Sequence, residues 1–362
     1  MNSPVGVGII GCGNISPAYL NLARAFPVLS IRALADIDPV VAAARGAQFD
    51  IPAMSVEQLL ADSQIEVIVN LTVPQSHVPV GLRALAAGKH LYSEKPLGVN
   101  TAQARELLAA AKAADLRVGC APANFLGPAH QACRRHIDEG AIGSPLGGTA
   151  FFMCPGHERW HPSPAFYYQE GGGPMLDMGP YYLTALVNLL GPVARVAAMA
   201  TRPRHTRTVS SEPLRGTIVP VNVDTHVAGT LQFRSGAVVS LTMSFDVPKH
   251  GHSPLELYGT EGAMLLPDPD SFGGQIHHAT AGSEWSVIGG EMLRMERDYR
   301  ILGVAELSAA IRSGEPHRAS GELALHVLEV IEAFERSSSG GCHVDIISAP
   351  PRPAPFTSDC LQ

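Results

Sequence analysis

The first twenty residues constrain the fold most, because a strongly apolar stretch runs directly into a glycine-rich turn. Residues 5–16 are VGVGIIGCGNIS, and their Val and Ile content predicts a strand buried on both faces. A helical pattern begins at about Pro17. Gly11 permits a tight turn, Gly13 lets the backbone approach a pyrophosphate, and the free N–H groups at the helix start attract the anion. This order predicts a dinucleotide-binding turn.

The second expected strand supports this interpretation and indicates which dinucleotide binds. Its sequence, SIRALAD, ends at Asp36, 20 residues after Ser16, the small residue that replaces the usual third glycine or alanine. A carboxylate there accepts hydrogen bonds from a ribose diol and repels a 2′-phosphate. The next residue, Ile37, is not the arginine that would bind that phosphate. We therefore expect NAD, with NADP less favoured. The alternative is that Asp36 only caps the strand end beside Pro39.

Strand and helix patterns then alternate up to residue 122, which predicts a doubly wound parallel sheet with right-handed crossovers. Ligands on such sheets bind at the carboxyl ends of the strands. Lys95 lies at one such end, between Glu94 and Pro96, where its ammonium either acts on a ligand or forms a structural ion pair with Glu94. Together with the glycine turn, these strand ends give the predicted cofactor-binding set of Gly11, Gly13, Asn14, Ile15, Asp36, Thr72, Pro74, His77, Glu94 and Lys95.

The segment 171–191, GGGPMLDMGPYYLTALVNLLG, predicts a helix over 175–190 that stops at Gly191. Asp177 and Tyr181 are four residues apart, so one helical face would present a carboxylate and a phenol side by side. Tyr182 is rotated away by about a quarter turn. If a tyrosine works with Asp177, we expect it to be Tyr181. The alternative is structural, with a carboxylate that stabilises the helix N-terminus and an ordinary half-buried aromatic.

The pattern changes from about residue 123. A helix is followed by strands without intervening helices, near 193–201, 222–233, 237–247 and 254–259. Such a run predicts an α+β domain with a mostly antiparallel sheet. We therefore expect an NAD-binding domain at 1–122, a substrate-binding and oligomerisation domain at 123–345, and an extended proline-rich tail at 346–362.

The loop over residues 154–170 is rich in aromatic and imidazole side chains. Aromatic faces stack on the C–H side of a sugar ring, and imidazoles bond to its hydroxyls. We predict that Trp160 and His161, with Asn124 at the interdomain junction, contact a polyhydroxylated substrate. The alternative is a purely structural loop. Cys154, His157 and His161 also stand as C-x2-H-x3-H, but no fourth ligand is spaced nearby, so no metal site is expected.

Charge and composition exclude several classes of partner. The net charge of −7, without any Lys/Arg block, predicts no binding to nucleic acid or to an anionic membrane. No apolar run is long enough for a membrane span, and the N-terminus lacks the basic start of a signal peptide. The six cysteines form no CxxC pair, which is typical of reduced thiols. We expect a cytoplasmic protein with a small-molecule substrate.

Across nearly the whole chain the sequence resembles the glucose–fructose oxidoreductase/inositol dehydrogenase (Gfo/Idh/MocA) family. The resemblance rests on GCGNIS, Asp36, TVPQSH, SEKPLG, DEGAIGSP, GGGPMLDMGPYY and the YGTEG turn at 258–262. It implies a Rossmann domain followed by a domain with a large, open-faced, mostly antiparallel sheet. In that family such a sheet is open on one face and buries the other face against a second subunit, which implies a homodimer or homotetramer.

The resemblance also implies catalytic roles for Lys95, Asp177 and Tyr181. Histidine is common in the family at the position of Tyr181, although some branches also place tyrosine there. The pKa of tyrosine is ordinarily near 10, and an ammonium within about 4 to 6 Å, such as that of Lys95, lowers it. The implied activity is NAD-dependent hydride transfer between a nicotinamide and a secondary alcohol of a sugar, polyol or sugar derivative. Two alternatives remain, an NAD-dependent glycosidase or lyase that oxidises its sugar only transiently, and a non-catalytic ligand sensor.

Overall fold

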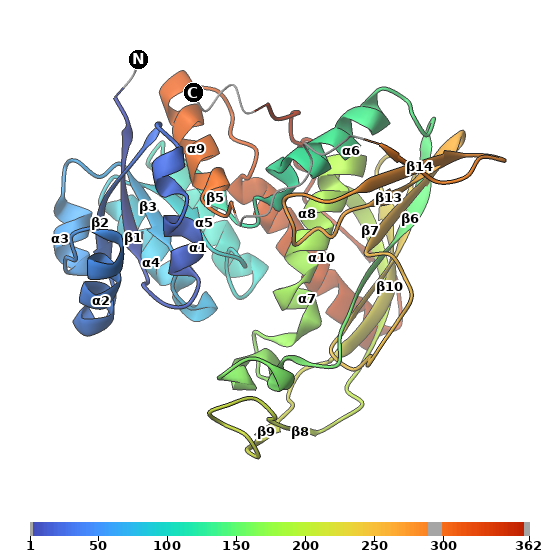
Figure 1. Ribbon diagram of the computed structural model, residues 1–362, viewed down its shortest axis with the longest axis horizontal. Coiled ribbons are helices and arrows are strands. Elements are labelled where there is room, and N and C mark those ends of the chain that lie inside the picture. Colours follow the sequence, from blue (N-terminus) through green and yellow to red (C-terminus); the bar gives the residue numbers. More distant parts are fainter. Residues whose placement is uncertain (1–2, 289–298, 358–362) are drawn as a thin grey trace. The chain divides into compact units, whose positions relative to one another are not determined.

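The computed structural model describes residues 3–288 and 299–357, and Figure 1 shows their ribbon. Contacts between residues divide the chain into two compact units. The first unit takes in residues 1–126, 297–328 and 353–362, and the second takes in residues 127–296 and 329–352. The chain thus returns twice to the first unit after leaving it, a feature that the predicted succession of two domains and a tail did not contain.

A five-stranded parallel sheet forms the centre of the first unit. All residues of its first strand are buried, as expected for a strand covered on both faces. The strand order is β2-β1-β3-β4-β5, so the chain reverses its direction of travel through the sheet at β1, where such folds bind ligands. The strands are β1 (Val5–Ile10), β2 (Leu29–Ala35), β3 (Val67–Asn70), β4 (His90–Ser93) and β5 (Val118–Cys120).

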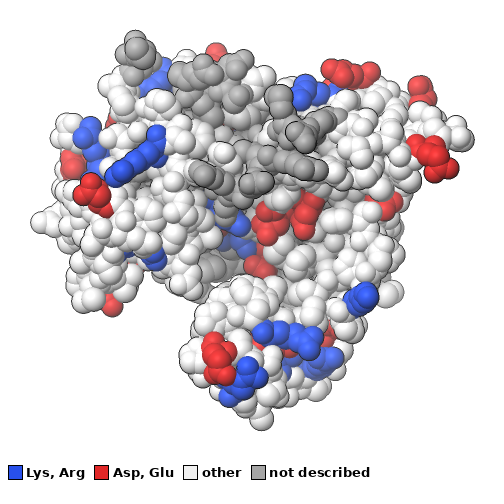
Figure 2. Space-filling view, in the orientation of Figure 1, with Lys and Arg blue, Asp and Glu red and all other residues white. Residues whose placement is uncertain are grey.

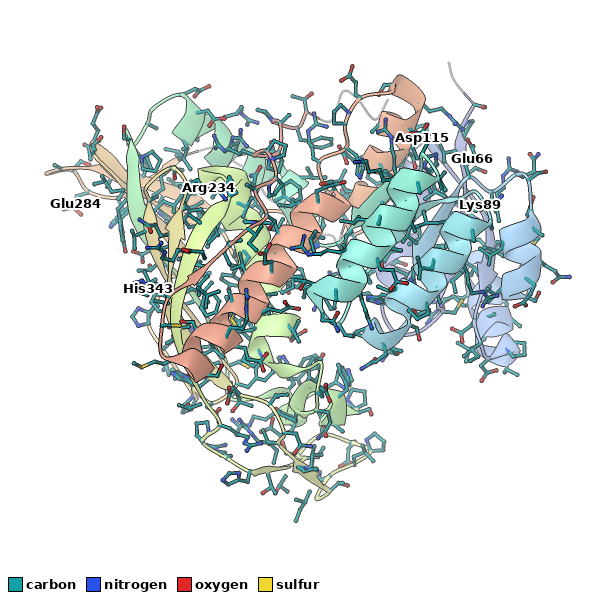
Figure 3. The ribbon with its side chains drawn as sticks, turned by 180° about the vertical axis from the view of Figure 1, so that it is seen from behind. Glu66, Lys89, Asp115, Arg234, Glu284 and His343 are labelled. Carbon is teal, nitrogen blue, oxygen red and sulfur yellow. The ribbon has the colours of Figure 1, made fainter. Side chains whose placement is uncertain are left out.

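Helices cover both faces of this sheet, and neighbouring residues of β4 show it. Leu91 points toward α4 and α5, where it lies against Gly81, whereas Tyr92 points toward α1 and α9, where it meets Tyr19 and Gly303. Figure 1 shows α1 and α9 in front, and Figure 3 shows α4 and α5 from behind. The helices include α1 (Ser16–Leu20), α2 (Pro39–Phe49), α3 (Val56–Ala61), α4 (Pro74–Ala86), α5 (Thr101–Ala113) and α9 (Leu302–Ser313), with 3-10 turns η1 (Ala23–Ala25) and η2 (Asn124–Leu126).

Charged residues with structural partners lie at the amino ends of β3 and β4. Lys89 Nζ donates to the carbonyl oxygens of Asp62 and Ile65 at 2.8 and 2.7 Å. Glu66 accepts from Arg312 of α9 at 2.6 Å. Figure 3 labels Glu66 and Lys89 close together at this end of the unit. These contacts stabilise the amino edge of the sheet. The predicted cofactor residues all lie at the opposite, carboxyl edge.

A nine-stranded sheet dominates the second unit, in the order β15-β14-β13-β12-β6-β11-β10-β7-β16. Its pairs are antiparallel except for β6 and β11, which run parallel. This confirms the predicted fold class, a parallel Rossmann sheet followed by a domain with a mostly antiparallel sheet. The strands are β6 (Pro145–Met153), β7 (Val193–Thr201), β10 (His226–Phe233), β11 (Val238–Ser244), β12 (Leu255–Gly259), β13 (Gly262–Leu266), β14 (Ile276–Thr280), β15 (Ser286–Ile288) and β16 (Val344–Asp345).

One face of the nine-stranded sheet packs against helices. Phe334 of α10 lies where a Cβ on Gly229 of β10 would point, and Phe152 of β6 meets Tyr182 of α8 with ring centroids 6.4 Å apart. Figure 1 shows no described helix on the other face, which is the open face that the family resemblance implied. The helices are α6 (Pro128–Asp138), α7 (Gly173–Asp177), α8 (Gly179–Leu190) and α10 (Gly321–Gly340), with 3-10 turns η3 (His157–Arg159) and η4 (Pro164–Tyr168).

The prediction of one continuous helix over 175–190 was wrong. The structure has two helices, because α7 ends at Asp177 and α8 begins at Gly179. Pro180 is the physical reason, since a proline nitrogen has no hydrogen to donate and its ring clashes with the carbonyl four residues earlier. Proline is well tolerated in the first turn of a helix, which is where α8 has it. Asp177 and Tyr181 therefore lie on consecutive helices instead of on one helical face.

A small two-stranded hairpin, which the sequence did not predict, completes the second unit. It consists of β8 (Thr206–Thr208) and β9 (Ile218–Pro220), which pair antiparallel. Its side chains share a small buried cluster with the loop that follows β6, made of Tyr168, Val209, Val219, Val221 and Phe245. The hairpin is therefore packed onto the loop in which aromatic substrate residues were predicted.

On the face of the molecule shown in Figure 2, Lys and Arg side chains gather over the part of the second unit that carries the β8–β9 hairpin, with Asp and Glu among them. Among the described helices, none combines the length and the apolar composition needed to cross a bilayer.

Candidate active site

The glycine-rich turn after β1 has the geometry that a bound pyrophosphate requires. Gly11 has a φ of 103°, and a Cβ there would lie 2.6 Å from the backbone that follows β3, so only glycine fits. Gly13 is exposed, and nothing lies within 4 Å of the position that its Cβ would take. This open space, beside the first N–H groups of α1, fits the pyrophosphate of a dinucleotide. The same turn contains Asn14 and Ile15.

The carboxylate of Asp36, at the end of β2, is held against this turn. Its Oδ2 accepts the N–H of Cys12 at 2.7 Å, and its Oδ1 accepts the N–H of Asp38 at 3.0 Å. Arg45 of α2 reaches the same turn and donates to the carbonyl oxygens of Cys12 and Gly13, each at 3.2 Å. Asp36 thus presents a fixed negative charge at the edge of the sheet where the first two strands end.

His77 joins two of the strand-end turns in which cofactor residues were predicted. Its Nδ1 lies 2.6 Å from the carbonyl oxygen of Pro96, and its Nε2 lies 3.0 Å from that of Thr72. The ring is buried, and burial lowers the pKa of His77. Pro74 is the first residue of α4 in the same turn. With a carbonyl oxygen at each ring nitrogen, His77 is placed to fasten the turn after β3 to the turn after β4.

Glu94 is buried at the end of β4 and has partners of its own. Tyr19 donates its hydroxyl to Oε1 at 2.8 Å, and the backbone N–H of Lys95 donates to Oε2 at 2.9 Å. Burial, together with the charge of Glu94, raises the pKa of Tyr19. These bonds fix the backbone of Lys95, whose side chain is half-buried, at the carboxyl edge of the sheet.

In the second unit, Asp177 at the end of α7 is bonded to a histidine from the preceding loop. His157 Nε2 lies 3.0 Å from Asp177 Oδ2, and the two side chains are 8% and 17% exposed. Trp160 donates its indole N–H to Nδ1 of His157 at 3.1 Å. The imidazole is thus held at both of its nitrogens, once by an indole and once by a carboxylate.

The predicted substrate residues Trp160 and His161 lie in the same loop. Trp160 is 60% exposed even though its N–H is bonded, so an aromatic face remains available to a ligand. Nδ1 of His161 accepts the N–H of Ser163 at 3.0 Å, and burial lowers the pKa of His161. The His161 backbone is fixed as well, because its carbonyl oxygen accepts from Ser211 at 2.6 Å.

The two tyrosines at the start of α8 have different environments. Tyr182 points toward β6 and donates its hydroxyl to Asp268 Oδ1 at 3.4 Å. Burial raises the pKa of Tyr182, and the neighbouring charge of Asp268 adds to that effect. Tyr181 is 5% exposed and lies at the end of α8 nearer Asp177. The hydroxyl of Tyr182 therefore has a structural partner, and Tyr181 is the candidate for proton transfer.

The predicted catalytic residues are divided between the two units. Lys95 belongs to the first, together with Asn124, which is buried in η2, whereas Asp177 and Tyr181 belong to the second. Across residues 3–288 and 299–357, no cluster of three His, Cys, Asp or Glu side chains has the arrangement of a metal site. Burial raises the pKa of the Cys154 thiol to about 11, so this cysteine of the C-x2-H-x3-H pattern is a poor thiolate donor.

Sequence reasoning missed the bond between His157 and Asp177. His157 was noted only as part of a C-x2-H-x3-H pattern and as one of several aromatic and imidazole residues in a loop. The two positions are 20 residues apart and belong to no common periodic pattern. No local sequence pattern therefore predicts the contact. The only available signal was the density of aromatic residues around it.

Comparisons with known proteins agree with this fold. Residues 5–121 match the description "Oxidoreductase family, NAD-binding Rossmann fold", and residues 130–265 match "GFO/IDH/MocA C-terminal domain". Among solved structures, levoglucosan dehydrogenase in complex with NADH and L-sorbose superposes with a TM-score of 0.82 at 21% identity, covering 96% of this chain and 100% of that one. At this identity the likeness concerns the fold.

Two named enzymes are similar in sequence. A 1,5-anhydro-D-fructose reductase from Ensifer adhaerens is 29% identical over 58% of this chain and 60% of its own length. A trans-1,2-dihydrobenzene-1,2-diol dehydrogenase from Mus musculus is 30% identical over 66% of this chain and 67% of its own length. The match therefore spans about three fifths to two thirds of these relatives. The chain belongs to the Gfo/Idh/MocA family of oxidoreductases with an NAD-binding Rossmann fold.

Proposed function

We propose that this oxidoreductase uses NAD to transfer a hydride between the nicotinamide and a secondary alcohol of a sugar, polyol or sugar derivative. The observation that carries the proposal is the carboxylate of Asp177, fixed by His157 directly before the helix that bears Tyr181. The relatives named above act on an anhydro sugar and on a cyclic diol. An oriented hydrogen-bond acceptor and a phenol that can exchange a proton are groups that the oxidation of an alcohol uses.

The preference for NAD over NADP rests on Asp36. Its carboxylate lies against the glycine turn, where it would accept hydrogen bonds from the ribose hydroxyls and repel a 2′-phosphate. Arg45 is the nearby cation that could attract such a phosphate, but its guanidinium already donates to the carbonyl oxygens of the turn. In this proposal the group that faces the ribose hydroxyls is therefore the carboxylate of Asp36.

The roles of three side chains follow from their chemistry. As a phenolate, Tyr181 Oη takes the proton from the substrate hydroxyl and becomes a phenol, and Lys95 Nζ stabilises the negative charge that develops on the substrate oxygen. Asp177 orients the substrate by accepting a hydrogen bond from a neighbouring hydroxyl. When bound, the nicotinamide supplies the acceptor for the hydride. In the reductive direction the same groups act in reverse, with Tyr181 as the proton donor.

The loop that holds His157 also supplies the substrate contacts of this proposal. The exposed ring of Trp160 suits stacking on the C–H face of a sugar, and His161 suits bonding to its hydroxyls. Asn124 is the third residue that contacts the substrate in this proposal. A screen of pyranoses, inositols and cyclic diols would identify the substrate.

That screen also tests the proposal. Purified protein is incubated with NAD and each compound, and absorbance in the reduced-nicotinamide band is followed. The proposal expects at least one compound to give stoichiometric NADH. Product formation without any net NADH would instead support the glycosidase or lyase alternative, and NAD binding without turnover of any compound would support a ligand sensor.

The open face of the nine-stranded sheet supports a further part of the proposal, a homodimer or homotetramer. Paired residues on neighbouring strands project to the same face, and the registers place four exposed apolar side chains on this one. They are Met199, Val238, Tyr258 and Val287. A second copy of the chain would cover this face.

A further inference from the structure

We propose that His157 is a positioning residue for Asp177, and that Trp160 sets the imidazole tautomer in which it acts. The inference rests on the proposed function, because it assigns the way in which one of the proposed catalytic residues is held. The contacts that carry it all lie within the second unit.

The tautomer follows from the partners of the two ring nitrogens. An indole N–H can only donate, so Nδ1 of His157, 3.1 Å from Trp160 Nε1, must offer its lone pair. In a neutral imidazole the proton is then on Nε2. That nitrogen lies 3.0 Å from Asp177 Oδ2, which accepts the bond as a carboxylate. One protonation state, neutral His157 with ionised Asp177, satisfies both contacts.

The other protonation states leave a conflict at Trp160. An imidazolium, or a neutral ring with its proton on Nδ1, would direct an N–H toward the indole N–H, so that two donors face each other. Removing the indole donor is therefore expected to release the ring to other protonation states. Trp160 thus has a function beyond the exposed face that it offers to a substrate.

The ring of His157 cannot easily turn out of this arrangement. The rings of Tyr167 and Phe245 have centroids 4.4 Å from that of the imidazole. The backbone N–H of His157 donates to the hydroxyl oxygen of Tyr168 at 3.0 Å, and that hydroxyl in turn donates to Glu158. Ring and backbone are therefore both fixed, and the contact to Asp177 is preorganised.

A buried ion-pair network anchors the residue that follows His157. Glu158 receives the guanidinium of Arg207 on its carboxylate at 3.1 Å, and its carbonyl oxygen accepts the N–H of Ser210 at 2.9 Å. Arg207 also donates to Asp246 at 2.6 Å. Arg207 and Ser210 belong to the β8–β9 hairpin and its connecting loop. The hairpin thus fixes the backbone next to His157 and helps to hold its imidazole within hydrogen-bonding distance of the Asp177 carboxylate.

The consequence for the reaction concerns the charge and direction of Asp177. A bond from Nε2–H to Oδ2 stabilises the ionised carboxylate and fixes the plane of the carboxyl group. An ionised carboxylate only accepts hydrogen bonds, so Asp177 orients the substrate by accepting from a hydroxyl next to the reacting one, whose proton goes to Tyr181. Loss of the bond would therefore lower kcat more than it raises KM.

Histidine nitrogen chemical shifts test the tautomer without any turnover. Protein labelled with ¹⁵N in histidine is recorded in the absence of added cofactor, and the signals of His157 are assigned by their loss in His157→Gln. We expect Nδ1 to have the shift of an unprotonated nitrogen and Nε2 that of a protonated one. Trp160→Phe should move both shifts toward a tautomer mixture, whereas Trp285→Phe, which alters the other tryptophan, should not. A protonated Nδ1 in the wild type, or shifts unchanged in Trp160→Phe, would overturn the assignment.

Kinetics with a substrate found in the screen test the positioning role. His157→Phe keeps an aromatic ring but removes both nitrogens, and it should lower kcat on the order of 100-fold, as expected for a misoriented catalytic group. His157→Gln, whose amide both donates and accepts, should remain within about tenfold of the wild type. Equal losses in the two variants, or an unchanged kcat in His157→Phe, would refute the role. A wild-type protein without turnover would overturn the proposed function, while the nitrogen shifts would still decide the tautomer.

Discussion

Arg207 and Glu158 form a buried ion pair in the second unit, with their side chains only 1% and 8% exposed. One guanidinium nitrogen of Arg207 lies 3.1 Å from Glu158, and another lies 2.6 Å from Asp246. Arg207 therefore bridges two carboxylates, and Arg204 lies 3.9 Å from the second of them, Asp246. Because an isolated buried charge is costly, Glu158 in particular depends on Arg207.

The first prediction concerns this network. Arg207→Leu leaves the buried carboxylate of Glu158 without its cation and Asp246 with only the more distant Arg204, which should lower the free energy of unfolding by about 3 to 5 kcal/mol. The matched control is Arg215→Leu in the same hairpin, since Arg215 pairs with Glu212 in an exposed position and should change stability little. Urea unfolding of the variants measures both effects. Similar values for the two variants would contradict the assigned role.

Asp36 provides a test of cofactor preference. Asp36→Asn removes the negative charge and keeps one of the two side-chain oxygens, so that one of the N–H groups of Cys12 and Asp38 retains its acceptor. We expect a weaker affinity for NAD and a stronger affinity for NADP, with the ratio of the two changing by about tenfold or more, because a charged acceptor is worth roughly 1.5 to 3 kcal/mol. Titration calorimetry with each dinucleotide measures the change. An unaltered ratio would show that Asp36 does not select the cofactor.

The stability of the second unit should fall in mild acid. His130 of α6 is buried and donates from Nε2 to the Ser271 carbonyl oxygen at 2.9 Å, and burial lowers its pKa below the usual value. The unfolded chain therefore takes up this proton near pH 6.5 while the folded chain does not, so acid favours unfolding. Each such proton contributes a slope of up to about 1.4 kcal/mol per pH unit.

Thermal unfolding between pH 7.5 and pH 5.5 measures this effect. His77, His90 and His161 have pKa values that are lowered in the same direction, by burial first. His130→Gln keeps a donor for Ser271 and should lose less stability than the wild type over this interval. A variant with the same pH dependence as the wild type would remove His130 from the explanation.

The exposed face of the nine-stranded sheet gives a prediction about assembly. Met199 is 80% exposed on β7, and it is one of the four apolar side chains of the proposed contact. Met199→Glu would place a charge in that contact and should shift the protein toward monomers in light scattering. Ile218→Glu, on the small β8–β9 sheet away from this face, is the matched control and should leave the mass unchanged. A wild-type protein that is already monomeric would refute the proposed oligomer.

The parts of the fold that the sequence predicted are those with strong local patterns. The apolar strand before Gly11 and the alternation up to residue 122 were sufficient for the parallel sheet, because buried strands and crossover helices each have a characteristic period. The strand expected at 193–201 is β7. These features depend on residues close together in the chain.

Features that depend on distant residues were not predictable in this way. The hairpin strands β8 and β9 have three residues each, too few for an alternation to be recognised. Residues near Ala319 return to the first unit through backbone pairing with Cys120, which no local pattern encodes. The bond between His157 and Asp177 is of the same kind. Only the interruption at Pro180 had a local cause, and the helical periodicity concealed it.

The proposal as a whole depends on a tyrosine that exchanges a proton with the substrate. Tyr182, next to it, is bonded to Asp268 and serves as the matched control. With a substrate from the screen, Tyr181→Phe and Tyr182→Phe are compared by NADH formation and by NAD affinity. We predict that Tyr181→Phe loses turnover by a factor on the order of 100 or more while binding NAD normally, and that Tyr182→Phe retains turnover. Wild-type turnover in Tyr181→Phe would contradict the proposed chemistry.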